Sequence, residues 1–253
     1  MPLGDLFPTL SWPVATAIVG IFLAAGLVKG VVGLGLPTVA MALLALLMSP
    51  AQAAALLIVP SLATNLWQMC PMATLPAVMR RIGGMQVGIC VGTLGGAWML
   101  GAPAGAWATV SLGVALVAYA LWGLSGASLR VSARAERIWG PLVGVATGVV
   151  TAATGVFAVP AVPYLQSLGL PREALIQAMG VSFTVSTLAL AAGLLVNASY
   201  DAATAGTSFW MLVPAMVGMA LGQGLRKTMS PQVFRCVFLG SLLLLGAYLI
   251  GST

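Results

Sequence analysis

The chain alternates between long apolar segments and short polar turns along almost its whole length. A helix needs about 20 mostly apolar residues to cross the hydrocarbon core of a bilayer. Because most of the segments approach this length, the pattern predicts an all-α, polytopic membrane protein of about ten segments. The expected segments are residues 10–29, 34–48, 51–69, 83–101, 104–124, 139–156, 158–169, 174–196, 205–224 and 233–251.

The sixth and seventh of these segments are too short to be two full crossings. Residues 139–170 span about 48 Å if they are wholly helical, whereas two crossings need about 60 Å of helix and a turn. We therefore expect two half-crossings that meet in the region from Thr151 to Pro160. The second segment, 34–48, is also short.

A glycine- and proline-broken apolar stretch occurs twice, about half a chain apart. The first copy is GLVKGVVGLGLP, from Gly26 to Pro37, and the second is GVVTAATGVFAVP, from Gly148 to Pro160. Irregular backbone at membrane depth is tolerated only where it is buried in protein or lines a cavity. Interrupted segments at matching positions in two halves point to the substrate site of a transporter. Pro37 and Pro160 are the expected broken-helix, or hinge, positions.

The halves also share the element that follows the break. SPAQAAALLIVPSLATNLWQ begins at Ser49 and LPREALIQAMGVSFTVSTLA at Leu170, and each has a proline at the start of a helix with small polar residues. Five segments per half is an odd number, so the second repeat is expected to be inverted, as in many secondary transporters. The expected units are a first inverted repeat (1–125), a cytoplasmic linker (126–138) and a second inverted repeat (139–253).

Composition supports the membrane class, and the positions of the charges give an orientation. Only 6% of residues are charged, against roughly 25% in soluble domains, so lipid must cover most of the surface. The net charge of +6 does not indicate nucleic-acid binding here, because the basic residues fall in short loops. With the N-terminus outside, every basic residue lies on the inner side, which predicts N-out and C-out. The inner residues are Lys29, Arg80, Arg81, Arg130, Arg134, Arg137, Arg172, Arg226, Lys227 and Arg235, and the outer acids are Asp5 and Asp201.

Lys29 is the basic residue within a broken stretch, and two interpretations remain open. It either attracts an anion near the substrate path, as intramembrane charges often do, or extends to the cytoplasmic interface. The role of the glycines in this stretch also has two interpretations. Gly30, Gly33 and Gly35 either allow a turn whose N–H groups face an anion, or allow close packing of helices.

Small polar residues form a stripe on the helix after each break. Four of them recur at i, i+3, i+4 and i+7, which places them on one helix face: Ser61, Thr64, Asn65 and Gln68. The candidates in the second half are Ser182 and Ser186 on the helix after the break, and Thr151, Thr154 and Gly155 within the break itself. These side chains either contact a substrate oxyanion or make hydrogen bonds between helices.

The residues needed for intramembrane catalysis are missing. The chain has no histidine, and its acids, Asp5, Glu136, Glu173 and Asp201, fall in loops or at segment ends. General acid–base catalysis and metal binding both need such groups in position. We therefore expect no enzyme activity, no catalytic or metal-binding residue and no cofactor.

The two broken stretches resemble the signatures of the TauE/SafE family (TSUP) of sulfite and organosulfonate exporters. GVVGLGLPTVAMALL from Gly30 is similar to the first signature and TGVFAVPAVPYLQSLGLP from Thr154 to the second, although LGLP and ATGVF contain fewer glycines than is usual in the family. The resemblance implies a secondary transporter of the bacterial inner membrane that exports sulfite, thiosulfate, sulfoacetate or a related sulfonate by alternating access. The expected partners are this small anion and the lipid bilayer, with no nucleic acid and with a homodimer left open.

Two other functions remain compatible with the sequence alone. One is a passive channel for anions or small solutes. The other is a membrane scaffold that transports nothing itself.

Overall fold

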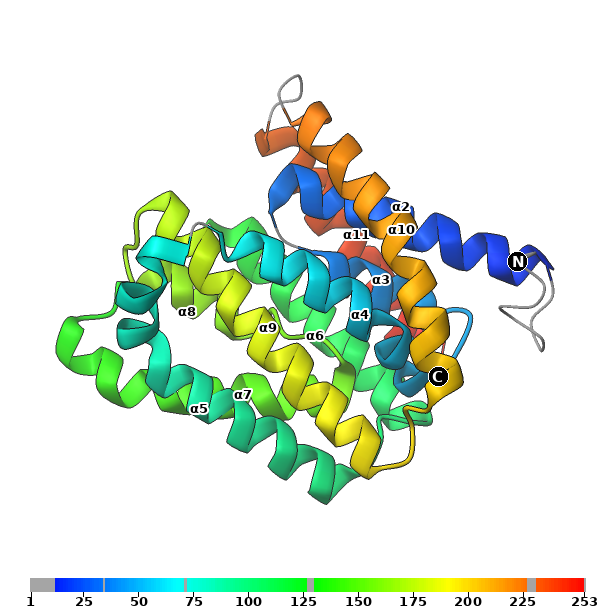
Figure 1. Ribbon diagram of the computed structural model, residues 1–253, viewed down its shortest axis with the longest axis horizontal. Helices are drawn as coiled ribbons and strands as arrows, with labels where there is room; N and C mark the ends of the chain where they lie inside the picture. Colours follow the sequence, from blue (N-terminus) through cyan, green and yellow to red (C-terminus); the bar gives the residue numbers. More distant parts are fainter. Residues whose placement is uncertain (1–11, 34, 71, 127–129, 227–230, 253) are drawn as a thin grey trace.

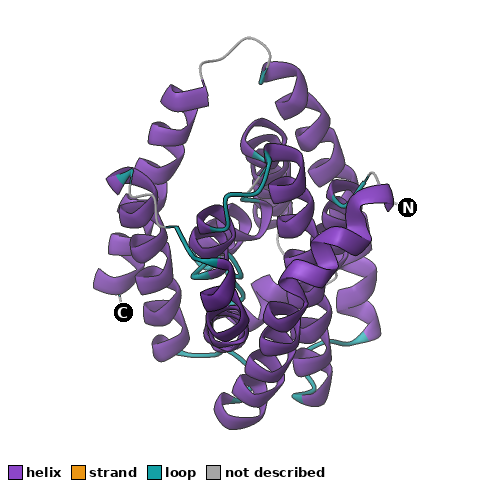
Figure 2. Cartoon of the chain, turned by 90° about the vertical axis from the view of Figure 1, so that its left-hand side faces the viewer, coloured by secondary structure: helices purple, strands orange, loops and turns teal. Residues whose placement is uncertain are grey.

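A computed structural model describes residues 12–33, 35–70, 72–126, 130–226 and 231–252. Within these ranges the chain folds into ten α-helices and one short 3-10 helix, with no strand (Figures 1 and 2). Each predicted apolar segment corresponds to one α-helix. The helices are α2 (Trp12–Val32), α3 (Leu36–Leu44), α4 (Pro50–Gln68), α5 (Leu75–Leu100), α6 (Ala106–Ser125), α7 (Ala133–Thr154), α8 (Ala161–Ser167), α9 (Arg172–Val196), α10 (Ala202–Leu225) and α11 (Pro231–Gly251), and the 3-10 helix is Met72–Thr74. Asp5 and Lys227, used above for the orientation, lie outside the described residues.

Local sequence explains where several of these helices begin. Ser49 caps α4 through a capping box with Gln52, and Pro50 occupies the first turn, where its missing N–H leaves no hydrogen bond unmade. Asp201 caps α10 by accepting a hydrogen bond from the backbone N–H of Thr204 at 2.8 Å. Such caps satisfy N–H groups that have no partner within the helix.

The outer surface of the helices is apolar. In the described part of the chain, six helical segments are long and apolar enough to cross a membrane. Large apolar side chains on these helices are exposed, including Val87, Val91 and Trp98 on α5. A soluble protein rarely exposes continuous apolar surface of this extent, so this surface faces lipid. The six segments are Trp12–Val32, Met72–Leu100, Ala106–Ser125, Arg172–Val196, Ala202–Leu225 and Phe234–Gly251.

Several helix pairs join the first half of the chain to the second, among them those of α5 with α9 and of α4 with α10. Helix α2 packs on α10, α5 on α7, α4 on α9 and α6 on α11 (Figure 1). Glycines bring two of these pairs into backbone contact. A Cβ atom added to Gly26 would lie 2.2 Å from the Ala215 carbonyl oxygen, and one added to Gly88 would lie 2.3 Å from the Pro141 carbonyl oxygen. Small residues are the usual means of such close approach in membranes.

The break in the second half lies where it was expected, but the helices on its two sides, α7 and α8, differ in length. Helix α7 has 22 residues, about 33 Å of helix, so it is longer than the half-crossing expected from the sequence, although it is not among the six segments named above as apolar enough to cross a membrane. The reason for its length is its N-terminus: α7 begins at Ala133, capped by Ser132, within the range expected to be a linker. Helix α8 has only 7 residues, so the shortening falls on the seventh segment alone. Helix α3, with 9 residues, is short as predicted.

Candidate functional site

The side chain of Lys29 is buried and turned toward α4. It lies in the last turn of α2 and is only 3% exposed. Its ammonium group donates hydrogen bonds to the Thr64 hydroxyl oxygen, at 3.0 Å, and to the Asn65 amide oxygen. The lysine therefore points into the protein, and its contact with a substrate stays a prediction.

The partners of Lys29 are neutral. The Thr64 hydroxyl donates to the Pro60 carbonyl oxygen at 2.7 Å, which leaves its oxygen free to accept from the lysine. Among the described residues, the one salt bridge joins Arg81 to Glu136 and does not involve Lys29. A buried ammonium group without a counter-charge costs several kcal/mol of desolvation, and an anion next to Lys29 would offset this cost.

Hydrogen-bond donors around Lys29 remain without acceptors. The Asn65 amide nitrogen and the Ser61 hydroxyl are both buried and have no hydrogen-bond partner in the structure. An amide nitrogen carries two N–H donors, and an ammonium group carries three, of which Lys29 uses two. A buried donor without an acceptor costs about 1–3 kcal/mol. An oxyanion, which has only acceptors, is the ligand class that would satisfy these groups together.

The first break lies directly beside this cluster. Gly33 follows the last residue of α2 with φ of 80°, and Gly35 precedes α3 with φ of 112°, backbone conformations that favour glycine. The Gln68 side-chain amide donates to the Gly33 carbonyl oxygen at 2.9 Å, so α4 holds the break in place. Pro37 lies in the first turn of α3. Gln68 thus stabilises the break through one bond, and its buried amide oxygen has no partner.

Gly30 has a different position from the other glycines of this stretch. It lies within α2 and packs against α10, where a Cβ atom would come 2.3 Å from the Met219 carbonyl oxygen. This contact is the helix packing that the sequence had left as an alternative. Contact between Gly30 and a substrate stays a prediction.

Further buried polar side chains lie on α5, α7 and α9. The Gln86 side-chain amide donates to the Ser182 hydroxyl oxygen at 3.0 Å, and the buried Ser186 hydroxyl has no partner. Thr151 and Thr154 donate to carbonyl oxygens of their own helix, those of Thr147 and Val150. The sequence did not single out Gln86, because a lone polar residue on an apolar helix gives no periodic signal.

The second break is tightly packed against the first half. Gly155 ends α7 with φ of 70°, and a Cβ atom there would lie 2.9 Å from the Met41 side chain of α3. Pro160 precedes the first residue of α8. Helix α9 also crosses α4 next to the Lys29 cluster, since a Cβ atom on Gly180 would lie 3.2 Å from the Asn65 carbonyl oxygen. The structure therefore brings the polar stripes of α4 and α9 onto adjoining helices.

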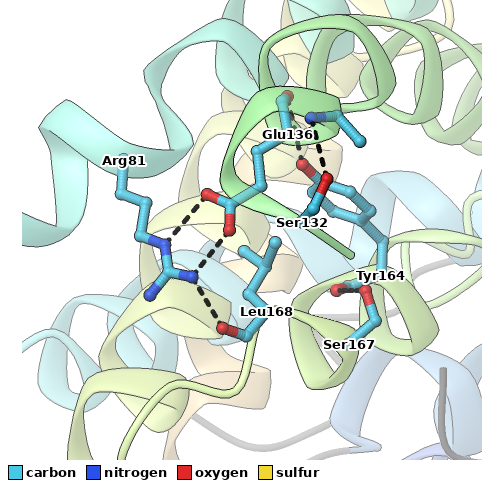
Figure 3. Close-up of polar contacts among 7 residues, drawn as sticks. Arg81, Ser132, Glu136, Tyr164, Ser167 and Leu168 are labelled. Carbon is cyan, nitrogen blue, oxygen red and sulfur yellow. Dashed lines mark hydrogen bonds and ion pairs between the residues drawn. The ribbon is translucent and has the colours of Figure 1, made fainter. Parts of the chain in front are cut away.

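Another polar cluster joins α5, α7 and the end of α8 (Figure 3). Arg81 donates two hydrogen bonds to the Glu136 carboxylate, at 3.0 and 2.7 Å, and one to the Leu168 carbonyl oxygen, at 2.6 Å. The Tyr164 hydroxyl is 3.4 Å from the Glu136 carbonyl oxygen. Glu136 is thus engaged in an ion pair, and the described residues contain no group of acids and cysteines that could hold a metal ion.

Comparison with known proteins agrees with the membrane helices and the paired breaks. The sequence matches the protein family described as sulfite exporter TauE/SafE over residues 18–249. This range includes both breaks and the whole of α3 to α10. Neither the curated proteins nor the solved structures gave a match. Because the match covers nearly the whole sequence, the chain is a multi-pass integral membrane protein that belongs to the TauE/SafE family of sulfite exporters.

Proposed function

We propose that this protein is a secondary transporter that exports a small sulfur-containing oxyanion across the bacterial inner membrane by alternating access. The substrate is sulfite, thiosulfate, sulfoacetate or a related sulfonate. The observation that carries the proposal is the buried Lys29 ammonium group, whose partners Thr64 and Asn65 are neutral. Membership of a sulfite-exporter family supports the same class of substrate.

The polar side chains offset the cost of removing an anion from water. Lys29 supplies the opposite charge, and the unpartnered Asn65 amide and Ser61 hydroxyl supply neutral donors. Hydrogen bonds with one charged partner contribute about 1.5–3 kcal/mol, more than neutral ones. Because the site adds one positive charge and no negative charge, it favours anions over neutral solutes of similar size.

The pairing of helices supports an inverted-repeat mechanism. If helices α2 to α6 correspond in order to helices α7 to α11, then α2 corresponds to α7 and α5 corresponds to α10. The contact between α2 and α10 is then equivalent to the contact between α7 and α5. The pairs α4–α9 and α6–α11 join equivalent helices. Exchange between two such arrangements would open the site first to one side and then to the other. The arginine-bearing ends of the helices would be cytoplasmic, with both termini outside.

Flux measurements test the proposal directly. Purified protein in liposomes is expected to carry radiolabelled sulfite with saturable kinetics, and unlabelled sulfite on the opposite side should accelerate the flux. Lys29→Gln should lower the flux while the variant still folds. Saturable flux with counterflow supports a transporter, and flux without saturation would instead support a passive channel. Absence of flux for sulfite, thiosulfate and sulfoacetate from folded protein would refute the proposed substrate class.

A further inference from the structure

A cavity with a strongly positive lining lies outside the Lys29 cluster. It has a volume of about 210 Å³ and lies between α2, α6, α8, α9, α10 and α11. Three arginines from different elements line it: Arg172 in the first turn of α9, Arg226 at the end of α10, and Arg235 in α11. Helices from both halves of the chain therefore contribute to one positive cavity.

In the described part of the chain no salt bridge joins these arginines to an acid, although Glu173 follows Arg172 in α9. No carboxylate lines the cavity in the described part of the chain. Glu136 is paired with Arg81, and Asp201 caps α10 at the end opposite Arg226. Gathering three like charges is unfavourable in itself, and guanidinium groups are well suited to bind oxyanions through paired hydrogen bonds.

One of the arginines is fixed in position at the rim. The Arg235 guanidinium donates to the Gly123 carbonyl oxygen of α6 at 2.9 Å. Trp122 and Tyr119, from the same part of α6, form an aromatic wall of the cavity. This bond holds Arg235 beside that wall.

The floor of the cavity adjoins the first break. Val32, Met179 and Phe238 line it. Val32 is the last residue of α2, one turn after Lys29, and a Cβ atom on Gly35 would lie 3.3 Å from the Phe238 ring. On the other side, Met179 precedes Gly180, which lies against Asn65 of α4. The apolar part of the lining therefore lies close to the residues of the first break and of the Lys29 cluster.

We propose that this cavity is a second oxyanion site, an antechamber in which the anion binds before it passes Val32, Met179 and Phe238 to reach Lys29. The inference rests on the proposed function, since it assigns a step of the path to the same substrate. Positive charge at the mouth of a path raises the local concentration of anions and their rate of capture. The same chemistry would also bind the phosphate of an anionic lipid, and the experiment must separate these two sources.

Trp122 provides a reporter that does not depend on transport. The full chain is placed in phosphatidylcholine nanodiscs and titrated with sulfite, and the fluorescence of the Trp122→Phe variant is subtracted. Saturable change in the Trp122 signal is expected. Arg172→Gln and Arg235→Gln should each weaken the apparent affinity, together by about tenfold, and Arg235→Lys should retain part of it. Lys29→Gln, a change in the other site, should leave the Trp122 response in place.

Each outcome supports or overturns the antechamber. No Trp122 response to sulfite, or a response unchanged in Arg172→Gln, would overturn it. A response to added phosphatidylglycerol in place of sulfite would also overturn it and assign the cavity to lipid. A retained Trp122 response without liposome flux would refute the transport function alone, whereas saturable flux without the response would refute the antechamber alone.

Discussion

The Lys29 ammonium nitrogen lies 3.0 Å from the Thr64 hydroxyl oxygen, so the last turn of α2 is joined to the C-terminal part of α4 beside the first break. A lysine in this position, 3% exposed, has little access to water. Because its protein partners are neutral, the cluster gains most from a ligand that carries negative charge. Changing the charge of the cluster is therefore the most direct way to test it.

Asn65→Asp should close the site to anions. The change keeps the size of the side chain but replaces the free amide donors with a carboxylate oxygen beside Lys29. We expect the affinity for sulfite to fall by about 100-fold, which is about 2.7 kcal/mol of binding free energy. Isothermal titration calorimetry on the purified protein measures this.

The matched control for that variant is Gln52→Glu. It makes the same neutral-to-acidic change on α4, at an exposed position in the first turn, where glutamate also completes a capping box. Its affinity for sulfite should equal that of the wild type. Equal affinity in Asn65→Asp and the wild type would show that Asn65 and Lys29 do not contact the anion.

Much of the fold follows from the sequence, because apolar length and helix-start residues are local signals. Ser49 followed by Pro50 marks the start of α4, and Gly155 marks the end of α7, as the structure has them. The start of α7 is missed because Arg134, Glu136 and Arg137 make its first turns as polar as a loop. In the structure the helix begins before them, where Ser132 caps it and Glu136 of its first turn pairs with Arg81 of α5.

The candidate site follows from the sequence less completely. Helical spacing places Thr64 and Asn65 on one face of α4, but spacing cannot tell which neighbouring helix that face contacts. The direction of Lys29 depends on how α2 packs against α10 and α4, which is a tertiary property. Gln86 shows the same limit, since its partner Ser182 lies 96 residues away.

Arg81→Gln should destabilise the protein more than Glu136→Gln. Both substitutions break the ion pair, but Arg81 also satisfies the Leu168 carbonyl oxygen. The Arg81 side chain is 37% exposed, so we expect the pair itself to contribute less than about 1 kcal/mol. Losing the bond to the Leu168 carbonyl adds about 1 kcal/mol. Thermal unfolding at low and high salt measures both effects, and only the ion-pair part should shrink with salt. A larger loss in Glu136→Gln would contradict the proposed role of the Leu168 carbonyl.

The cap at Asp201 should make stability depend on pH in the acidic range. Hydrogen bonds from the Thr204 side chain and backbone lower the pKa of the Asp201 carboxyl below its ordinary value of 3.8. Because the pKa is lower in the folded state, the Asp201 cap contributes fully to the stability of the fold above pH 3.8. This contribution is lost as the pH falls through the pKa of Asp201 in the folded state. Asp201→Asn keeps a capping side chain but removes this titration. Unfolding temperatures measured from pH 6 to pH 3 should therefore fall more steeply for the wild type, and parallel curves would contradict the assignment.

Two glycines of α2 offer a matched test of the contact between α2 and α10. At Gly26 a Cβ atom would lie 2.2 Å from the Ala215 carbonyl oxygen, whereas at Gly20 it would meet nothing within 4 Å. Gly26→Ala should therefore separate the helices and cost about 1–3 kcal/mol of stability. Gly20→Ala should be neutral or raise stability by up to about 1 kcal/mol, because alanine favours helix over glycine. Thermal unfolding of both variants in the same detergent gives the comparison. If Gly26→Ala unfolds at the same temperature as Gly20→Ala, then α2 and α10 are not in backbone contact, and the end of α2 that carries Lys29 is not held in place by α10.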